Sequence, residues 1–193
     1  MNKLITSLVA AFALASSAHA AAITFDLQGR SGIGMRFNNE NPASASGSGT
    51  GGKILSGIIY DTVSKILTLN VGWGSGKGFT DLTGAVTAAH IHAAPDALLT
   101  SSGAVIINLD GATVGFNASG TNGGWTNTTV TLTAPQETQL LAGQLYLNAH
   151  TAANGGGEIR GNLVQSVPEP ASAGLLGLGT LLLAARRKRT AQA

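Results

Sequence analysis

Residues 140–163, LLAGQLYLNAHTAANGGGEIRGNL, carry the clearest structural pattern in the chain. Every second residue of 144–150 is apolar, which is the period of a β-strand with one face on a core. Residues 154–157, Asn-Gly-Gly-Gly, supply backbone positions that tolerate positive φ and therefore a tight reversal. Alternation resumes at 158–163, so the stretch predicts a β-hairpin. The side chains expected to point away from its core are Tyr146, Asn148 and His150.

Further short strands are predicted on both sides of this hairpin. Residues 54–60 and 65–73 form the clearest second hairpin, whose second arm places Leu67, Leu69, Val71 and Trp73 on one face. A long polar loop is expected at 38–52 and a flexible loop at 72–78, because glycine and serine dominate there. The remaining predicted strands, separated by Gly, Pro, Asp and Asn, are 23–27, 85–92, 104–109, 113–118 and 128–133.

One short helix is expected near residues 135–141. Thr133 can cap it, Pro135 suits its first turn and Gly143 ends it. About eight short strands with turns between them favour an all-β fold. We therefore predict an antiparallel β-sandwich, immunoglobulin-like or a superoxide-dismutase-like barrel.

Composition narrows the functional classes. The chain has 193 residues, 27 of them glycine, and no cysteine, so no disulfide braces the fold. The sequence pI of 9.2 suggests a nucleic-acid-binding protein, but five of the eleven basic residues lie in the two terminal segments. Residues 21–166 carry six basic and eight acidic side chains, a formal charge of −2. A weakly acidic domain lacks the electrostatic footprint of a DNA- or RNA-binding protein.

Both ends of the chain read as processing segments. Residues 1–20 contain Lys3, an apolar run and Ala18-His19-Ala20, which predicts a secretory signal peptide cut by signal peptidase after Ala20. Residues 167–189 contain a Pro-Glu-Pro box, an apolar run at 171–185 and a basic end. Fifteen helical residues reach about 22 Å, short of a ~30 Å hydrocarbon core, so flanking residues or bilayer thinning must complete a membrane span. The basic end would stay cytoplasmic, with the domain outside.

This tail resembles the PEP-CTERM sorting signal, the substrate of exosortases in Gram-negative bacteria. The resemblance implies transient anchoring in the inner membrane, cleavage near the box, and release or attachment at the cell surface. The alternative is a permanent C-terminal anchor. The residues that carry the signal are Pro168, Glu169, Pro170, Arg186, Arg187, Lys188 and Arg189.

The hairpin of residues 140–163 is similar to the signature of the CHRD domain, a family first described in chordin. The matching segments are AGQLY at 142–146, NAHT at 148–151, GGEIRG at 156–161 and AHIH at 89–92. The resemblance covers most of the mature chain, and we assign the CHRD domain to residues 21–166. The resemblance brings no defined activity. The residues of its motif that we expect to have structural roles are Gly157, Glu158, Arg160 and Gly161.

Three histidines form a candidate metal site. His90 and His92 are two apart on a predicted strand and therefore share a face. His150 can supply a third ligand, and three imidazoles suit copper or zinc, with water or a carboxylate such as Asp96 or Glu158 completing the site. The H-x-H strand also resembles copper/zinc superoxide dismutases, although their full histidine set, bridging histidine and disulfide cysteines are not identifiable here. The alternative is that the histidines are structural.

The other candidate sites favour structural interpretations. Glu158 and Arg160 share a face, and a buried pair linking the hairpin to a neighbour is preferred over acid–base chemistry. The G-x-G-x-x-G spacing at 47–52 leads into a strand, not a helix, so it does not predict a nucleotide site. Trp73, Trp125 and Tyr146 can form a carbohydrate or peptide platform, but core positions are preferred.

Two functions follow. The first is a non-enzymatic structural or binding module at the cell surface, associated with the envelope or biofilm matrix. The second is a copper- or zinc-binding domain, with superoxide-type chemistry as a further option.

Overall fold

The computed structural model describes residues 22–37, 47–111 and 113–166. The expected signal peptide at 1–20, the sorting segment at 167–189 and most of the polar loop expected at 38–52 lie outside these residues. The strands are β1 (Ala22–Gly29), β2 (Gly32–Ile33), β3 (Arg36–Phe37), β4 (Gly51–Asp61), β5 (Ile66–Trp73), β6 (Val86–Ala93), β7 (Ala104–Asn108), β8 (Phe116–Ser119), β9 (Asn122–Thr131), β10 (Leu145–Thr151) and β11 (Ile159–Gln165). The helices are the 3-10 turn η1 (Ser75–Lys77) and α1 (Ala134–Leu141).

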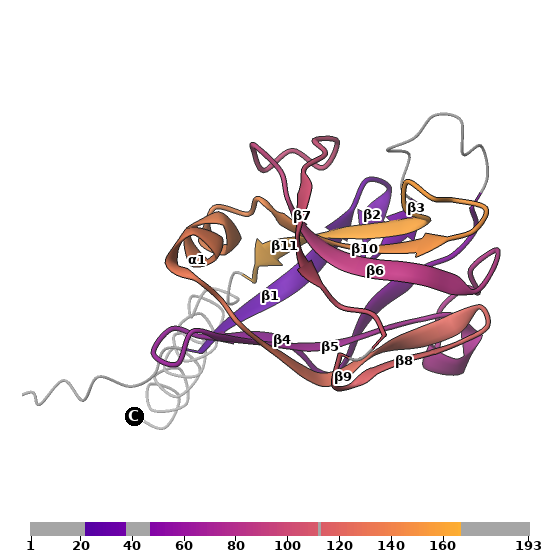
Figure 1. Cartoon of the computed structure of the whole chain (residues 1–193), viewed down its shortest axis with the longest axis horizontal. Coiled ribbons are helices and arrows are strands. Elements are labelled where there is room, and N and C mark those ends of the chain that lie inside the picture. The colour runs from indigo at the N-terminus through magenta and orange to yellow at the C-terminus, as the bar shows by residue number, and fades with distance from the viewer. Residues whose placement is uncertain (1–21, 38–46, 112, 167–193) are drawn as a thin grey trace, which may run out of the picture.

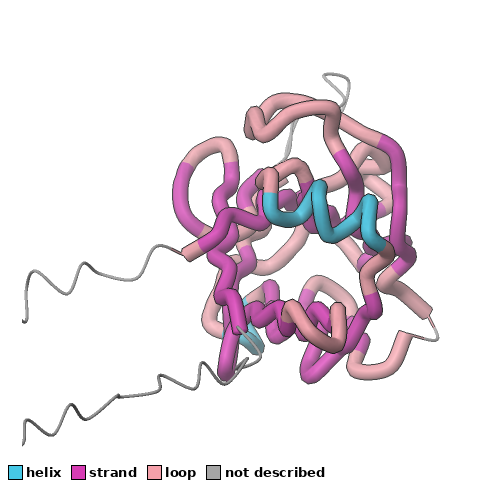
Figure 2. Tube along the Cα trace, turned by 90° about the vertical axis from the view of Figure 1, so that its left-hand side faces the viewer, coloured by secondary structure: helices cyan, strands magenta, loops and turns pink. Residues whose placement is uncertain are grey.

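The strands form one antiparallel sheet that curls around a single core. Its order is β7-β6-β10-β11-β1-β4-β5-β9-β8, with β2 paired to β1 and β3 paired to β11. Figure 1 shows β6, β10 and β11 on one side and β4, β5, β9 and β8 on the other, with β1 joining the two halves. Figure 2 looks into the curl from the side on which α1 lies. The predicted all-β antiparallel fold is confirmed, and its two layers are halves of a continuous sheet.

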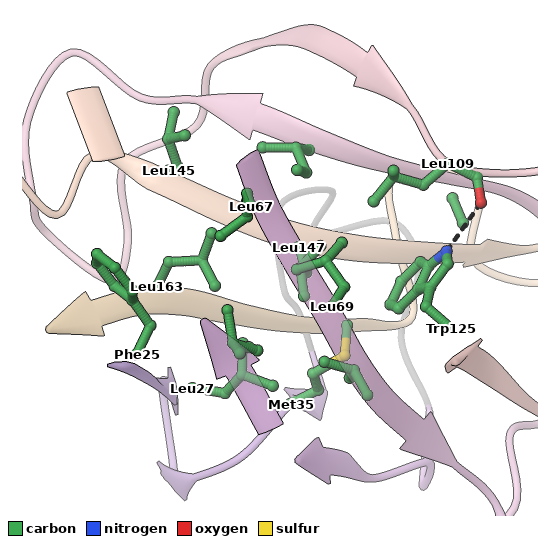
Figure 3. Packing of buried hydrophobic residues seen from close by; sticks show 14 of the residues in the cluster. Phe25, Leu27, Met35, Leu67, Leu69, Leu109, Trp125, Leu145, Leu147 and Leu163 are labelled. Carbon is green, nitrogen blue, oxygen red and sulfur yellow. Dashed lines mark hydrogen bonds between the residues drawn. The ribbon is translucent and has the colours of Figure 1, made fainter. Parts of the chain in front are cut away.

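The core fills the inside of the curl. Leu67, Leu69, Val71 and Trp73 are fully buried along β5, as their alternation predicts. Burying each such side chain stabilises the fold by about 1.5–3 kcal/mol relative to leaving it exposed. Trp125 on β9 packs edge-on against Trp73 with ring centroids 5.0 Å apart. Its indole Nε1 donates a 2.8 Å hydrogen bond to the Leu109 carbonyl (Figure 3), so its one polar atom is satisfied inside the core.

The hairpin predicted at the C-terminal end of the domain is present as β10 and β11. Tyr146 lies opposite Asn162 and Asn148 opposite Arg160. The polar face of β10 is covered as well as its core face, because every residue of this strand is buried. Loops at both ends fold back over that face, and β10 therefore lies between an apolar core and a second, polar interior.

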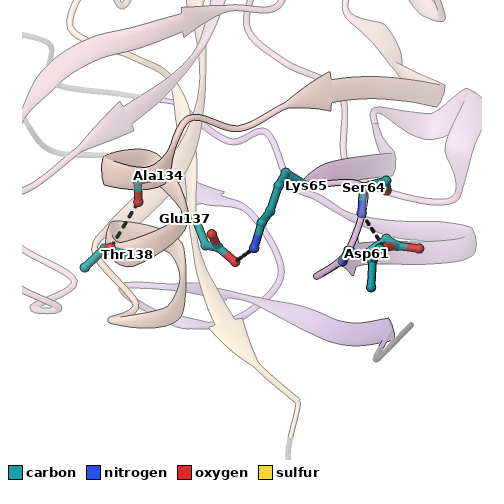
Figure 4. A network of polar contacts seen from close by, with 7 residues as sticks. Asp61, Ser64, Lys65, Ala134, Glu137 and Thr138 are labelled. Atoms are coloured by element: carbon teal, nitrogen blue, oxygen red, sulfur yellow. Dashed lines mark hydrogen bonds and ion pairs between the residues drawn. The ribbon is translucent and has the colours of Figure 1, made fainter. Parts of the chain in front are cut away.

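Helix α1 is capped and attached as its sequence predicts. The backbone N–H of Thr133 donates to the Gln136 side chain at 2.9 Å, completing a capping box, and Gly143 takes a φ of +71° after the helix. Leu140 is its buried anchor. On the solvent side Glu137 pairs with Lys65 at 2.8 Å, which ties the helix to the turn between β4 and β5 (Figure 4).

Several predicted boundaries are wrong for identifiable reasons. Gly51 and Gly52, expected in a loop, begin β4 and pair with the end of β5, where a Cβ on Gly52 would approach Phe79 to 2.9 Å. The strand expected at 113–118 begins only at Phe116, because Gly115 has a φ of +84° and closes a turn. β5 ends at Trp73 as predicted, and within the loop expected at 72–78 the structure has the 3-10 turn η1 at Ser75–Lys77. Strand β9 begins well before the expected residue 128.

Candidate functional site

The polar interior lies on the outward face of the three neighbouring strands β6, β10 and β11. Directly opposite residues in a sheet point to the same side, so the register fixes which side chains meet. His90 lies opposite Asn148, which lies opposite Arg160. His92 lies opposite Tyr146, which lies opposite Asn162. The strands therefore collect aromatic, cationic and amide side chains in two adjacent rows.

The three predicted histidines come together at one end of this face. Their potential ligand atoms all lie within 4.8 Å of one another. His90 Nδ1 and His150 Nε2 are 3.1 Å apart, and the ring centroids of His90 and His92 are separated by 5.4 Å. His92 and His150 are buried, and His90 is partly exposed. This cluster could hold a metal ion.

Each buried histidine is also held by a backbone carbonyl. His92 Nδ1 is 3.0 Å from the Gly103 carbonyl oxygen, and His150 Nδ1 is 2.9 Å from that of Gly155. Burial lowers the pKa of His90, and the neighbouring His150 and His92 lower it further, whereas the charge of Asp110 opposes them. His90 is therefore biased toward the neutral imidazole, which is the form that ligates metals.

Tyr146 links the histidines to Arg160. His92 stacks on the tyrosine ring with centroids 4.8 Å apart and an angle of 11° between the planes. The guanidinium carbon of Arg160 lies 3.5 Å from the centroid of the same ring, in cation–π geometry. The backbone N–H of Gly103 donates to the Tyr146 hydroxyl at 3.1 Å, and Arg160 Nε donates to Asn162 at 3.0 Å. Arg160, only 2% exposed, is thus held inside the domain.

Glu158 directly precedes β11 and is fully buried. Its Oε1 accepts a 2.7 Å hydrogen bond from the backbone N–H of Thr83. Its Oε2 accepts from the hydroxyls of Thr83 at 2.6 Å and Thr151 at 2.8 Å, and from the Asn154 amide at 3.3 Å. The carboxylate therefore joins the β10–β11 hairpin to the segment before β6, and both of its oxygens are engaged.

Comparison with models of protein families shows to which family the chain belongs. The family model of the CHRD domain matches residues 35–163, which is most of the chain. The chain belongs to the CHRD-domain family. Neither the curated proteins nor the solved structures contain a match to it.

The glycines of the CHRD signature fit their positions in different ways. Gly157 has a φ of +107°, and a Cβ there would lie 2.1 Å from the Asn148 amide oxygen. Gly161 lies opposite Leu147 on the core side of β11, where a Cβ would approach Leu27 to 3.0 Å. By contrast, nothing lies within 4 Å of a Cβ built on Gly155. The signature therefore places glycine where the hairpin packs most closely.

Other residues singled out in the sequence lie apart from the cluster. Asp96 accepts a hydrogen bond from the Leu98 N–H at 2.9 Å, and neither it nor Glu158 is grouped with the histidines. Trp73 and Trp125 are fully buried core residues and offer no ligand platform. Pattern reasoning missed Thr83 and the carbonyls of Gly103 and Gly155, because these partners are distant in sequence or belong to the backbone, which no residue pattern reports.

A second family comparison concerns the C-terminal end. A PEP-CTERM protein-sorting motif matches residues 166–189, immediately after β11. This motif marks an exported protein with a C-terminal, membrane-anchored sorting signal, which is then released to the cell surface. Together the CHRD domain and the motif fit an exosortase-sorted extracellular protein. No helix in the described part of the chain is both long and apolar enough to cross a membrane; the apolar run at 171–185 falls outside that part.

Proposed function

We propose that this chain is a non-enzymatic structural and binding module that an exosortase sorts to the cell surface, where it becomes part of the envelope or extracellular matrix. The observation that carries the proposal is the state of Glu158. This signature carboxylate is fully buried and accepts hydrogen bonds from three side chains and one backbone N–H. A catalytic acid or base must exchange a proton with substrate, whereas this group is committed to joining two parts of the fold. The CHRD domain is also not known as an enzymatic family.

The placement of the processing segments supports the same proposal. Strand β1 begins at Ala22, next to the expected signal-peptidase cut after Ala20. It pairs with β11, whose last residue Gln165 lies opposite Phe25, and the Ser166 N–H donates to the Thr24 carbonyl at 2.9 Å. We propose residues 21–166 as the mature domain. The two cuts would then release it close to the paired strands β1 and β11.

Dose dependence in the native host tests the proposal. A strain lacking the chain would receive the full-length protein at graded levels, and retained matrix mass would be measured against the amount of protein. A structural component gives a response proportional to its amount. Full restoration at a small fraction of the native level, followed by a plateau, would indicate turnover and contradict a structural role.

The matched control removes sorting without touching the sheet. A variant with Pro168, Glu169 and Pro170 all changed to Ala keeps every described residue and loses the box. We expect it to accumulate in the inner membrane and to leave the matrix unrestored. Restoration by this variant would show that surface delivery is not needed for the phenotype.

A further inference from the structure

Beyond surface display, we propose that His90, His92 and His150 form a binding site for a divalent transition ion, copper(II) or zinc(II). His90 and His92 are two residues apart on the same face of β6. His150 lies on β10, the strand that pairs with β6. The site is therefore built on paired strands rather than on a loop. Such a scaffold positions ligands well, because the register of the strands is fixed by the sheet.

The hydrogen bonds define which nitrogens can ligate. A carbonyl oxygen only accepts hydrogen bonds, so Nδ1 of His92 must carry the proton it donates to Gly103. By the same reasoning, Nδ1 of His150 carries the proton donated to Gly155. In each neutral ring the lone pair then lies on Nε2. In protein metal sites, the histidine nitrogen that does not bind the metal usually donates a hydrogen bond to a carbonyl or carboxylate oxygen in this way.

The contact between His90 and His150 marks where the ion would enter. Because His150 Nε2 carries a lone pair, His90 Nδ1 is the donor across their 3.1 Å contact. Two imidazole nitrogens on one tetrahedral zinc ion, each ~2.0–2.1 Å from the metal, are about 3.3 Å apart. An ion can therefore take the place of this proton with a small separation of the rings. The proton moves from Nδ1 to Nε2 of His90, so the ring stays neutral.

The surroundings favour one class of ion. His92 is fixed by its stack on Tyr146 and by Gly103, so it needs little ordering on binding. His90 is partly exposed, so an ion and a water as its fourth ligand can reach the site from solvent. Asp110 contributes negative charge near His90 without belonging to the ligand cluster. An all-imidazole donor set suits copper and zinc, whereas calcium and magnesium require oxygen ligands.

The test is metal binding by the full-length chain, purified in detergent without a histidine tag. After incubation with copper(II) or zinc(II) and dialysis, elemental mass spectrometry should give about one ion per chain, with copper the tighter, as the general order of stability requires. Copper-loaded protein should show nitrogen hyperfine structure from imidazole in its electron paramagnetic resonance spectrum. Less than about a tenth of an ion per chain for both metals would overturn the proposal.

Three variants separate a specific site from surface adsorption. His90→Ala removes the most exposed ligand, and His150→Gln keeps a polar side chain that can still bond Gly155. Each should weaken binding at least about tenfold while circular dichroism shows a folded sheet. Thr87→Ala changes an exposed residue of the same strand and should bind as the wild type does. Unchanged binding in both histidine variants would overturn the proposal, because the metal would then be held elsewhere.

Discussion

Replacing Glu158 by glutamine should destabilise the domain severely, although the two side chains are nearly equal in size. The carboxylate accepts from four donors, three of them within 2.8 Å. In the variant, the amide oxygen can still accept from the Thr83 N–H, but the NH₂ group replaces the oxygen that faced the other three donors. The threonine hydroxyls can rotate to accept, but the Asn154 amide must flip or lose its bond.

The magnitude follows from the number of charge-assisted bonds. Hydrogen bonds to a charged group contribute ~1.5–3 kcal/mol each, and bonds between neutral groups ~0.5–1.5 kcal/mol. Losing charge assistance on the three short bonds therefore costs about 3 kcal/mol in the free energy of unfolding. Denaturation by urea, followed by the fluorescence of the buried tryptophans, measures this quantity directly.

Glu137→Gln is the matched control, because it makes the same chemical change in a partly exposed ion pair. The side chains of Glu137 and Lys65 are 18% and 45% exposed, so loss of this pair should cost no more than about 1 kcal/mol. If Glu158→Gln costs no more than Glu137→Gln, the buried carboxylate does not hold the hairpin, and the structural interpretation of the CHRD signature is wrong.

Two further predictions concern the hairpin glycines and alkaline stability. Gly157→Ala should lower the free energy of unfolding by about 1–3 kcal/mol or more, because it strains a φ of +107° and forces a Cβ against Asn148. Gly155→Ala, whose Cβ would meet open space, should be tolerated. Equal losses for the two variants in urea denaturation would refute the contact with Asn148. Burial and the nearby Glu137 carboxylate raise the pKa of Tyr60 to about 12. The unfolded chain releases this proton near pH 10. The associated stability is therefore complete below pH 10 and falls between pH 10 and 12 by at most ~1.4 kcal/mol per pH unit. Tyr60→Phe should flatten this fall, and an unchanged slope would contradict the raised pKa.

The sequence predicts best where local pattern and local chemistry agree. Alternation in β5 identifies its buried face from Leu67 to Trp73, and Thr133 identifies the start of α1. Both features depend on neighbours within a few residues. The glycine-rich turn between β10 and β11 is predicted for the same reason.

Features set by distant contacts are not visible in the pattern. Alternation shows that the polar side of β10 faces away from the core, but it does not show that loops fold back over Tyr146 and Asn148 and bury them. One hydrogen-bond partner of Glu158, Thr83, lies 75 positions away. Gly51 and Gly52 are predicted to lie in a loop, but they begin β4, because they pair closely with the end of β5. Alternation also cannot show that the two layers are one curled sheet, since strand order is a property of long-range pairing.

The histidines illustrate both sides of this limit. Their spacing on β6 places His90 and His92 on one face, and the proximity of His150 follows once β6 and β10 pair. The carbonyls that orient the rings come from Gly103 and Gly155. A pattern of side chains does not predict which backbone carbonyls accept hydrogen bonds. The sequence therefore suggests the metal ligands but not the carbonyls that orient them.

Intact-mass spectrometry of the chain recovered from the surface of its native host would show whether residues 21–166 are delivered there as the mature CHRD domain. We expect a chain that begins at Ala21 and ends near Pro168-Glu169-Pro170, without the basic end. A surface-located chain that still carries Arg186-Arg187-Lys188-Arg189 would contradict it and show a permanent C-terminal anchor instead.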